Sequence, residues 1–325
     1  MKSIINTTDT IKFKDPVLLL IFNRPKTTAV VFEKIRQLKP SRLYIAGDGP
    51  RQNNNDTENV KKAREITTKI DWPCDLKTLF RDSNIGCKKS VSQAITWFFE
   101  HETQGIILED DCVPNLDFFY FCQNLLNHYV DNEEIFTITG NNFQNNNCRG
   151  DASYYFSKYN HCWGWATWKR AWQHYDGNIS FWLEWKKTDD WFKQTLNKTE
   201  RKYWTKIFNK VQKNQIDSWA YPWTASVWYK KGLTATPNVN LVTNIGFGES
   251  ATHTKKNYDN KFEIPSNNFK ILKHPKNINK DIEADEWTFN QHFNGKNLKF
   301  PYNLFSFPIR CFYYLQNKLN VFINH

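Results

Sequence analysis

The stretch Gly105-Ile106-Ile107-Leu108-Glu109-Asp110-Asp111 joins an apolar run directly to three adjacent carboxylates. A continuous apolar run of this length is typical of a strand buried on both faces of a parallel sheet. Polar residues that follow such a strand lie at its carboxyl end, the edge at which open α/β sheets bind ligands. The stretch therefore predicts a buried strand that delivers three acidic side chains to a ligand-binding edge.

Three more strand-like runs come before this one, with helical patterns between them. The runs are Pro16–Phe22, Arg42–Ala46 and Asp75–Phe80, and the helical patterns follow Pro25 and cover residues 58–70 and 91–99. Strands that alternate with amphipathic helices indicate right-handed crossovers and a mainly parallel sheet. We therefore expect an α/β fold, a mixed but mainly parallel sheet flanked by helices. No Gly-x-Gly-x-x-Gly or Walker loop follows a predicted strand, which argues against a dinucleotide or ATP enzyme.

Beyond Asn115 the pattern is less regular. It predicts a helix near 118–129, a strand at 135–139, largely helical structure over 186–215 and two short strands within 233–243. The spacing of Trp165, Trp168 and Trp172 predicts one buried helical face. The segment 255–297 is polar, and we expect it to be weakly structured.

Composition indicates a globular protein and restricts its partners. The chain has 325 residues, of which 40% are hydrophobic and 24% charged. Aromatic residues make up 16%, including 14 Trp. Indole rings stack on sugars and lie at membrane interfaces, but they also fill ordinary cores. The net charge is +11, spread along the chain in short clusters, so no nucleic-acid partner is expected.

The cysteines and the two ends of the sequence bear on location. Seven Cys occur without a Cys-x-x-Cys pair, which favours free thiols in a reducing compartment. Residues 1–14 lack the apolar core of a signal peptide, so we expect a cytoplasmic protein. Residues 299–325 mix aromatic and basic side chains. This tail is either a peripheral membrane segment at the inner membrane face or a helix packed on the protein.

Three adjacent carboxylates repel one another unless a cation offsets them. Mg²⁺ and Mn²⁺ prefer oxygen ligands and are held by one or two carboxylates together with phosphate oxygens. The triplet after residue 108 therefore favours a divalent metal that meets a diphosphate. A solvated acidic turn is the alternative, and the buried strand before the triplet counts against it.

The acidic triplet followed by Val113-Pro-Asn-Leu-Asp-Phe-Phe119 resembles the metal-binding segment of the N-acetylglucosaminyltransferase I family. It is more similar still to bacterial GT-A-fold glycosyltransferases of surface-polysaccharide loci. The segments 16–24, 46–48 and 163–165 match in the same order, and the resemblance covers residues 16 to 253. It implies a GT-A (Rossmann-like) fold, a UDP-sugar donor and Mn²⁺ or Mg²⁺ as cofactor.

The resemblance implies a role for each matched residue. Asp111 would ligate the metal, Asp110 would contact the ribose or a metal-bound water, and Glu109 would contact hydroxyls of the donor sugar. Arg24 would pair with the diphosphate or line the nucleotide pocket, and Asp48 would accept from the uracil ring. The other residues that it places at the donor are Arg81, Asn84 and His253. Asp48 has a simpler alternative, since a Gly-Asp-Gly-Pro turn favours Asp for backbone reasons.

An inverting sugar transfer needs a general base beside the acceptor hydroxyl. Asp217, in Asp217-Ser-Trp219, resembles the acidic segment that supplies the base in the related family. The alternative is that Asp217 caps the helix that follows, and Asp189 and Asp190 are rival bases. For the donor sugar and the acceptor, we expect stacking on three rings, Trp163, Trp165 and Trp219.

Together these observations predict a metal-dependent glycosyltransferase, inverting and with an Asp base. It would move a hexosyl or N-acetylhexosaminyl group from a UDP-sugar to a glycan or lipid-linked glycan in surface polysaccharide synthesis. The alternatives are a non-catalytic carbohydrate- or membrane-binding protein on the same fold and a sugar nucleotidyltransferase. Residues 1–254 would form the catalytic domain, with a nucleotide-sugar half at about 16–115 and an acceptor half at about 116–254. Residues 255–325 would form a C-terminal extension.

Overall fold

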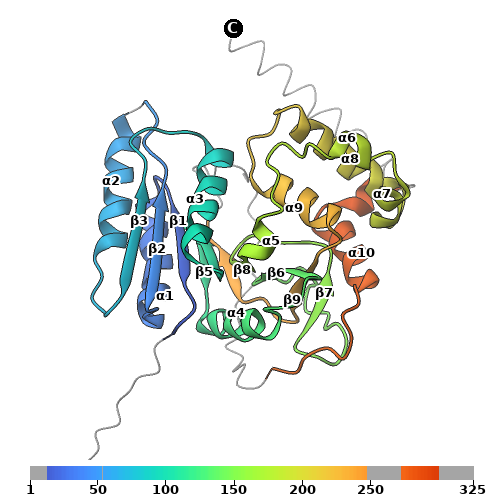
Figure 1. The fold of residues 1–325 in the computed structure, drawn as a ribbon, viewed down its shortest axis with the longest axis horizontal. Coiled ribbons are helices and arrows are strands. Elements are labelled where there is room, and N and C mark those ends of the chain that lie inside the picture. The colour runs from blue at the N-terminus through green and yellow to red at the C-terminus, as the bar shows by residue number, and fades with distance from the viewer. Residues whose placement is uncertain (1–12, 53, 247–271, 300–325) are drawn as a thin grey trace, which may run out of the picture.

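The computed structural model describes residues 13–52, 54–246 and 272–299, drawn as coloured ribbon in Figure 1. An eight-stranded sheet runs through the described part in the order β3-β2-β1-β4-β8-β6-β9-β7. Its strands are β1 (Val17–Ile21), β2 (Arg42–Gly47), β3 (Asp75–Phe80), β4 (Gln104–Glu109), β6 (Ile135–Thr139), β7 (Tyr154–Ser157), β8 (Trp165–Trp168) and β9 (Leu233–Pro237). The predicted fold class, a mixed and mainly parallel α/β sheet flanked by helices, is confirmed.

The first four strands are all parallel, and the sheet changes direction at β8. Strand β8 pairs antiparallel with β4 on one side and with β6 on the other, and β7 is antiparallel to β9. The predicted strands therefore exist with nearly the expected bounds. What the sequence pattern does not show is that β8 lies beside β4.

Both faces of the first strands are covered by helices, as their continuous apolar sequence requires. Val17 and Leu19 of β1 face one hydrophobic cluster, and Leu18 and Leu20 face the other. The first cluster lies under α1 (Pro25–Leu38), α2 (Asn54–Thr68) and α4 (Leu116–His128). The second lies under α3 (Cys87–His101) and the Trp-rich helices α5 (Lys169–Trp172), α6 (Trp182–Trp185), α7 (Asp189–Gln194), α8 (Lys198–Gln212) and α9 (Ala220–Tyr229).

A second, two-stranded sheet reaches the acidic triplet from a distant part of the chain. Strand β5 (Cys112–Pro114) directly follows Asp111 and pairs antiparallel with β10 (Val242–Asn244). The two described residues after β10, Ile245 and Gly246, are therefore held next to the triplet.

Two of the secondary-structure predictions are wrong. Trp165 and Trp168 lie on strand β8 and only Trp172 lies on a helix. All four residues of β8 are buried, and spacing alone does not separate a short buried strand from a buried helical face. The polar segment 255–297 is not weakly structured throughout. Its described part contains α10 (Ile282–Gln291) and all but the last residue of the short 3₁₀ helix η1 (Gly295–Leu298).

Helix α10 packs against the rest of the molecule through buried polar contacts. The amide of Gln144 donates to the hydroxyl of Thr288 at 2.9 Å, and the hydroxyl of Ser157 donates to Asp285 at 2.5 Å. Phe289 belongs to the second hydrophobic cluster. The described part of the predicted C-terminal extension thus packs on the α/β sheet and its helices.

Candidate functional site

The carboxyl ends of β1 and β4 lie side by side, because the two strands are parallel neighbours in which Leu20 pairs with Glu109. The chain that leaves β1 carries Arg24, and the chain that leaves β4 carries Asp110 and Asp111. These three side chains meet, as the sequence pattern predicts for polar residues at one sheet edge.

Arg24 makes a forked ion pair with two of the three carboxylates. Its Nη1 atom lies 2.7 Å from Oδ2 of Asp111, and Nη2 contacts Oδ1 of Asp110. The other oxygen of Asp110 accepts a hydrogen bond of 3.1 Å from the backbone amide of Phe22. Pro25 begins α1 and fixes the backbone just after Arg24, so the guanidinium projects from a rigid junction.

The cluster holds three carboxylates and one guanidinium, and this deficit of positive charge changes their ionisation. Burial and the charge of Asp111 raise the pKa of Glu109, although Arg24 and a hydrogen bond from Trp219 oppose the change. Burial also raises the pKa of Asp110 against the opposing effect of Arg24. For Arg24, burial lowers the pKa, but the two aspartates outweigh it and raise the pKa overall.

A divalent cation fits this chemistry, because hard cations bind carboxylate oxygens and would supply the missing positive charge. In the described residues, no group of three or more His, Cys, Asp or Glu side chains is arranged to hold a metal on its own. Beyond the described side chains, an ion beside Asp111 would need further oxygen ligands, of which waters and substrate phosphates are the usual sources. Oδ1 of Asp111 is contacted only by the thiol of Cys112 at 3.3 Å among the hydrogen bonds of the described part.

Gly246 closes the site from the side of β10. The amide of Ile245 donates to the backbone carbonyl of Asp111 at 2.8 Å, which places Gly246 against that residue. A Cβ atom at position 246 would lie 2.0 Å from Oδ2 of Asp111, so only glycine fits beside the carboxylate as it stands. No local pattern in the sequence indicates this contact, because it depends on the pairing of β10 with β5. The prediction for His253 falls outside the described residues.

Asp48 ties two loops together at the end of β2. Its carboxylate accepts from the backbone amides of Gly49 at 2.9 Å and Ile85 at 3.1 Å. Burial raises the pKa of Asp48, and these two hydrogen bonds and the charge of Arg81 oppose the rise. Asn84 adds a second tie, because its amide donates to the carbonyl of Gly49 at 3.1 Å. Asp48 therefore fixes the loop around residue 85, and a contact with a uracil ring remains a prediction.

Arg81 leaves β3 beside Asp48 and reaches α3. Its Nη2 atom donates to Oε1 of Gln93 at 2.8 Å. Its Nη1 atom is buried and has no hydrogen-bond partner among the residues that the structure describes. An unpaired buried donor costs free energy, which an acceptor oxygen from a ligand would relieve.

Asp217 sits at the amino end of α3. Its two oxygens accept from the backbone amides of Lys88 at 3.0 Å and Cys87 at 3.2 Å. The following helix, α9, starts at Ala220 without a side-chain cap, so the expectation that Asp217 caps it is wrong. Asp217 is exposed, and a carboxylate has about four lone-pair sites, so it keeps acceptor capacity beyond these two bonds.

The rival base Asp190 lies far from this edge. It is exposed in the first turn of α7 and pairs with Lys231 at 3.1 Å. Figure 1 shows α7 and α3 well separated. The neighbouring Asp189 shares that first turn.

The three Trp rings expected at the sugar differ in exposure. Trp165 and Trp219 are 1% and 3% exposed and stack on each other, with ring centroids 5.5 Å apart. Trp163 is half-buried and packs edge-on against Phe143 at 5.5 Å. Of these three rings, Trp163 is the one with surface for a ligand, and stacking remains a prediction.

Cys87 lies at the amino end of α3, close to several of the candidate residues. Burial raises the pKa of its thiol to about 12, and the charges of Glu109, Asp217 and Asp48 add to the rise. The same thiol therefore lies within electrostatic reach of side chains from three different loops. Cysteine spacing carries no such signal, since only the fold brings position 87 to this edge.

The six cysteines in the described part of the chain are free thiols, as predicted: Cys74, Cys87, Cys112, Cys122, Cys148 and Cys162. The part of the chain that the structure describes has no helix long and apolar enough to cross a membrane.

No protein-family model and no curated protein matches the sequence. Among solved structures, the chain is similar to HddC from Yersinia pseudotuberculosis, with 9% identity over 44% of this chain and a TM-score of 0.26. It is also similar to the mannosyltransferase PcManGT from Pyrobaculum calidifontis in complex with GDP-Man and Mn²⁺, with 12% identity over 49% of this chain and a TM-score of 0.35. A third match is 4-diphosphocytidyl-2C-methyl-D-erythritol synthase from Anaerococcus prevotii, with 7% identity over 69% of this chain and 88% of that one and a TM-score of 0.33.

This chain spans 59% of the length of HddC and 46% of the length of the mannosyltransferase. At these TM-scores the likeness is too slight to identify the activity of this chain.

Proposed function

We propose that the chain is a nucleotide-sugar-using enzyme and, more closely, a GT-A-fold glycosyltransferase that depends on Mn²⁺ or Mg²⁺. It moves a sugar from a UDP-sugar donor to a glycan or lipid-linked glycan of a surface polysaccharide, in the cytoplasm or at the inner membrane face. The observation that carries this proposal is the cluster of three carboxylates and a single guanidinium at the carboxyl edge of β1 and β4.

Asp111 is the residue assigned to the metal. Its side chain is 10% exposed and lies at the sheet edge. The backbone of Gly246 packs directly against its carboxylate. A bound divalent ion would offset the charge that develops on a departing nucleotide diphosphate. Arg24 orients Asp111 and Asp110 through its fork, and Phe22 holds the remaining oxygen of Asp110.

Asp217 is the residue assigned as general base for an inverting transfer. A base must lie within hydrogen-bond reach of the acceptor hydroxyl and keep a fixed direction. The two amides at the amino end of α3 give Asp217 that direction, and the exposed oxygens keep acceptor capacity for the acceptor hydroxyl beyond these two bonds. The thiol of Cys87 lies within electrostatic reach of both Asp217 and Glu109, which supports a base located near the donor edge.

A sugar nucleotidyltransferase is the competing enzyme class. Such enzymes favour a Gly-rich phosphate loop after the first strand, and here β1 is followed by Phe22-Asn-Arg-Pro25 with Arg24 engaged by two aspartates. Transfer of a sugar to an acceptor suits this arrangement better than condensation of a nucleoside triphosphate with a sugar phosphate.

A thermal-shift panel of nucleotide sugars with and without Mn²⁺ tests the donor site. A ligand at a hundred times its Kd stabilises a protein of 325 residues by about 4 °C. We expect that shift with a UDP-sugar and Mn²⁺ together, and its loss in Asp111→Asn. Asp71→Asn, an exposed aspartate on another loop, is the matched control.

A shift in Asp111→Asn equal to that of the unmodified chain, or no response to any nucleotide sugar with Mn²⁺, would end the proposal. Binding of a nucleotide sugar without release of UDP in the presence of any tested acceptor would instead support the non-catalytic alternative.

A further inference from the structure

Helix α8 carries an unusual concentration of positive charge. Its fifteen residues include a single acidic side chain, Glu200. Its basic residues recur at three- and four-residue spacings, which places them on neighbouring turns of one side of the helix. We define the basic face as Lys198, Arg201, Lys202, Lys206, Lys210 and Lys213.

No acidic side chain in the described residues neutralises this face. Glu200 points inward, is fully buried, and pairs with buried Lys158 at 2.7 Å. No residue of the basic face forms an ion pair within the described part of the chain. Like charges four residues apart destabilise a helix, so the row from Lys198 to Lys210 is unfavourable for α8 in isolation.

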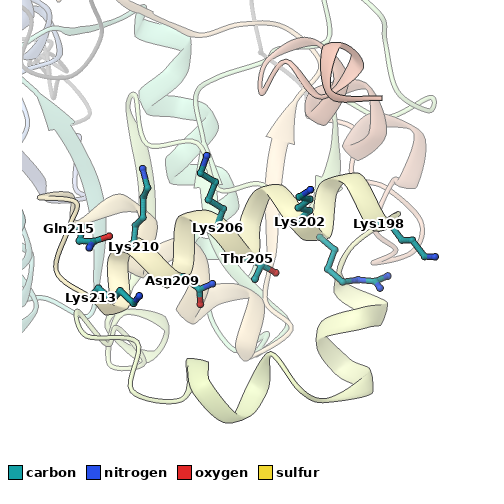
Figure 2. A pocket seen from close by; sticks show the side chains of 9 residues that line it. Lys198, Lys202, Thr205, Lys206, Asn209, Lys210, Lys213 and Gln215 are labelled. Atoms are coloured by element: carbon teal, nitrogen blue, oxygen red, sulfur yellow. The ribbon is translucent and has the colours of Figure 1, made fainter. Parts of the chain in front are cut away.

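The basic face lines a shallow groove of about 650 Å³. Figure 2 shows the labelled lysines along α8 and just past its end, with Thr205 and Asn209 between them and Gln215 at the far end of the row. The lining itself contains no aromatic ring, so it lacks the row of stacking platforms on which proteins hold successive bases of a single-stranded nucleic acid.

From this arrangement we propose that the basic face of α8 docks the protein onto an anionic phospholipid surface. Five of its six cations are lysines, whose flexible ammonium groups suit a fluid array of headgroups better than one rigid ligand. A helix of this length extends for roughly 22 Å, enough to meet several headgroups at once.

An apolar side chain stands at the edge of the basic face. Phe192 of α7 is 44% exposed, and the guanidinium of Arg201 lies 4.4 Å from the centre of its ring. Exposed aromatic rings beside lysines are the combination that interfacial membrane proteins use, with the charge at the headgroups and the ring at the acyl boundary.

The end of the basic face adjoins the candidate site. Just past α8, Asn214 accepts from Nζ of Lys88 at 3.2 Å, and Asp217 accepts from the backbone of Lys88 at 3.0 Å. A membrane under α8 would therefore lie next to the loop that carries Asp217. Membrane docking through α8 does not require the proposed sugar transfer, but it would bring a lipid-linked acceptor to that loop.

Flotation of the full chain with phosphatidylcholine vesicles, with and without phosphatidylglycerol, tests the inference. The test variant is Lys202→Gln/Lys206→Gln/Lys210→Gln, and the control is Lys34→Gln/Lys61→Gln/Lys69→Gln on the α1–α2 side of the molecule. Each variant lowers the formal net charge from +11 by three, to +8. Both keep residues 300–325, so any contribution of that tail is common to them.

We expect binding only to vesicles with phosphatidylglycerol, and weaker binding in high salt. Each lysine near such a surface strengthens binding about fivefold, so the test variant should bind on the order of 100-fold more weakly than the unmodified chain. The control should bind within a few fold of it. Gln and Lys have similar helix propensities, so the test variant should keep its helical circular dichroism.

Equal loss of binding in both variants would show that net charge alone is responsible and would overturn the inference. Absence of binding to anionic vesicles would overturn it as well. The inference would also be overturned if an RNA or DNA oligonucleotide bound through Lys202, Lys206 and Lys210 while the anionic vesicles did not bind.

Discussion

The Nη1 atom of Arg24 lies 2.7 Å from Oδ2 of Asp111, although the two residues are 87 positions apart in the chain. This pair joins the end of β1 to the end of β4 and stands at the centre of the candidate site. It also limits the repulsion among three adjacent carboxylates, because Arg24 is the cation that contacts two of them.

Arg24→Ala should therefore destabilise the protein. Removing one partner of a buried ion pair typically costs 3–5 kcal/mol, and because the Arg24 side chain is 21% exposed we expect about 2 to 4 kcal/mol. Urea unfolding at neutral pH measures the loss. Arg36→Ala, which removes an exposed pair with Asp71, should change the unfolding free energy little. Equal effects of the two substitutions would mean that the Arg24 fork does not hold the site together.

The raised pKa of Glu109 gives a pH dependence with a definite sign. Between the ordinary glutamate value of 4.5 and the raised one, the folded chain binds more protons than the unfolded chain. Stability from this group is therefore complete at low pH and is lost as the pH rises through that window. Glu109→Gln should remove this part of the decline, as followed by chemical unfolding at several pH values.

The exposed Glu100→Gln substitution on α3 serves as the control for this pH series. It should leave the slope of stability against pH unchanged. Parallel slopes for all three proteins would mean that Glu109 ionises normally in the folded state.

Asp217→Asn separates a structural role from a catalytic one. Asparagine keeps an oxygen that can accept from the amino end of α3, so stability should fall by less than about 1 kcal/mol. Transfer should be lost, because an amide cannot take a proton from the acceptor hydroxyl. Donor binding, followed by thermal shift, should persist.

Asn197→Ala is the matched cap control, since Asn197 accepts from two backbone amides at the start of α8. It should cost about 1 kcal/mol without loss of transfer. If Asp217→Asn retained full transfer activity, Asp217 would be a helix cap and not the base.

Gly246→Ala tests how tightly the loop after β10 must pack on Asp111. An added Cβ would lie 2.0 Å from the carboxylate, so either the loop or the side chain must move. We expect Mn²⁺-dependent binding of the nucleotide sugar to weaken at least tenfold, with a smaller change in melting temperature. Isothermal titration calorimetry and thermal unfolding measure the two effects.

Gly177→Ala provides the comparison, because its nearest neighbour would be an ordinary contact at 3.5 Å. It should leave donor binding unchanged. Normal binding by Gly246→Ala would show that the loop yields freely and does not shape the site.

Local sequence was enough to predict the strands β1 to β4, the helices between them and the edge at which the acidic triplet lies. The reason is that neighbouring residues in the sequence show these features as local patterns. A continuous apolar run indicates a strand buried on two faces, a 3.6-residue period indicates a helix, and the polar residues after a strand mark its end. The same logic placed Arg24, Asp48 and Asp111 at one edge, and the structure brings Arg24 and Asp111 into contact.

Tertiary structure alone decided which distant residues complete that edge. Asp217 meets the amino end of α3 from 129 and 130 positions away, Gly246 reaches Asp111 through the pairing of β10 with β5, and Trp165 and Trp219 bury each other. Each of these contacts depends on the order of strands in the sheet and on the antiparallel insertion of β8. The packing of the whole core sets the strand order, so a local pattern of residues does not predict it.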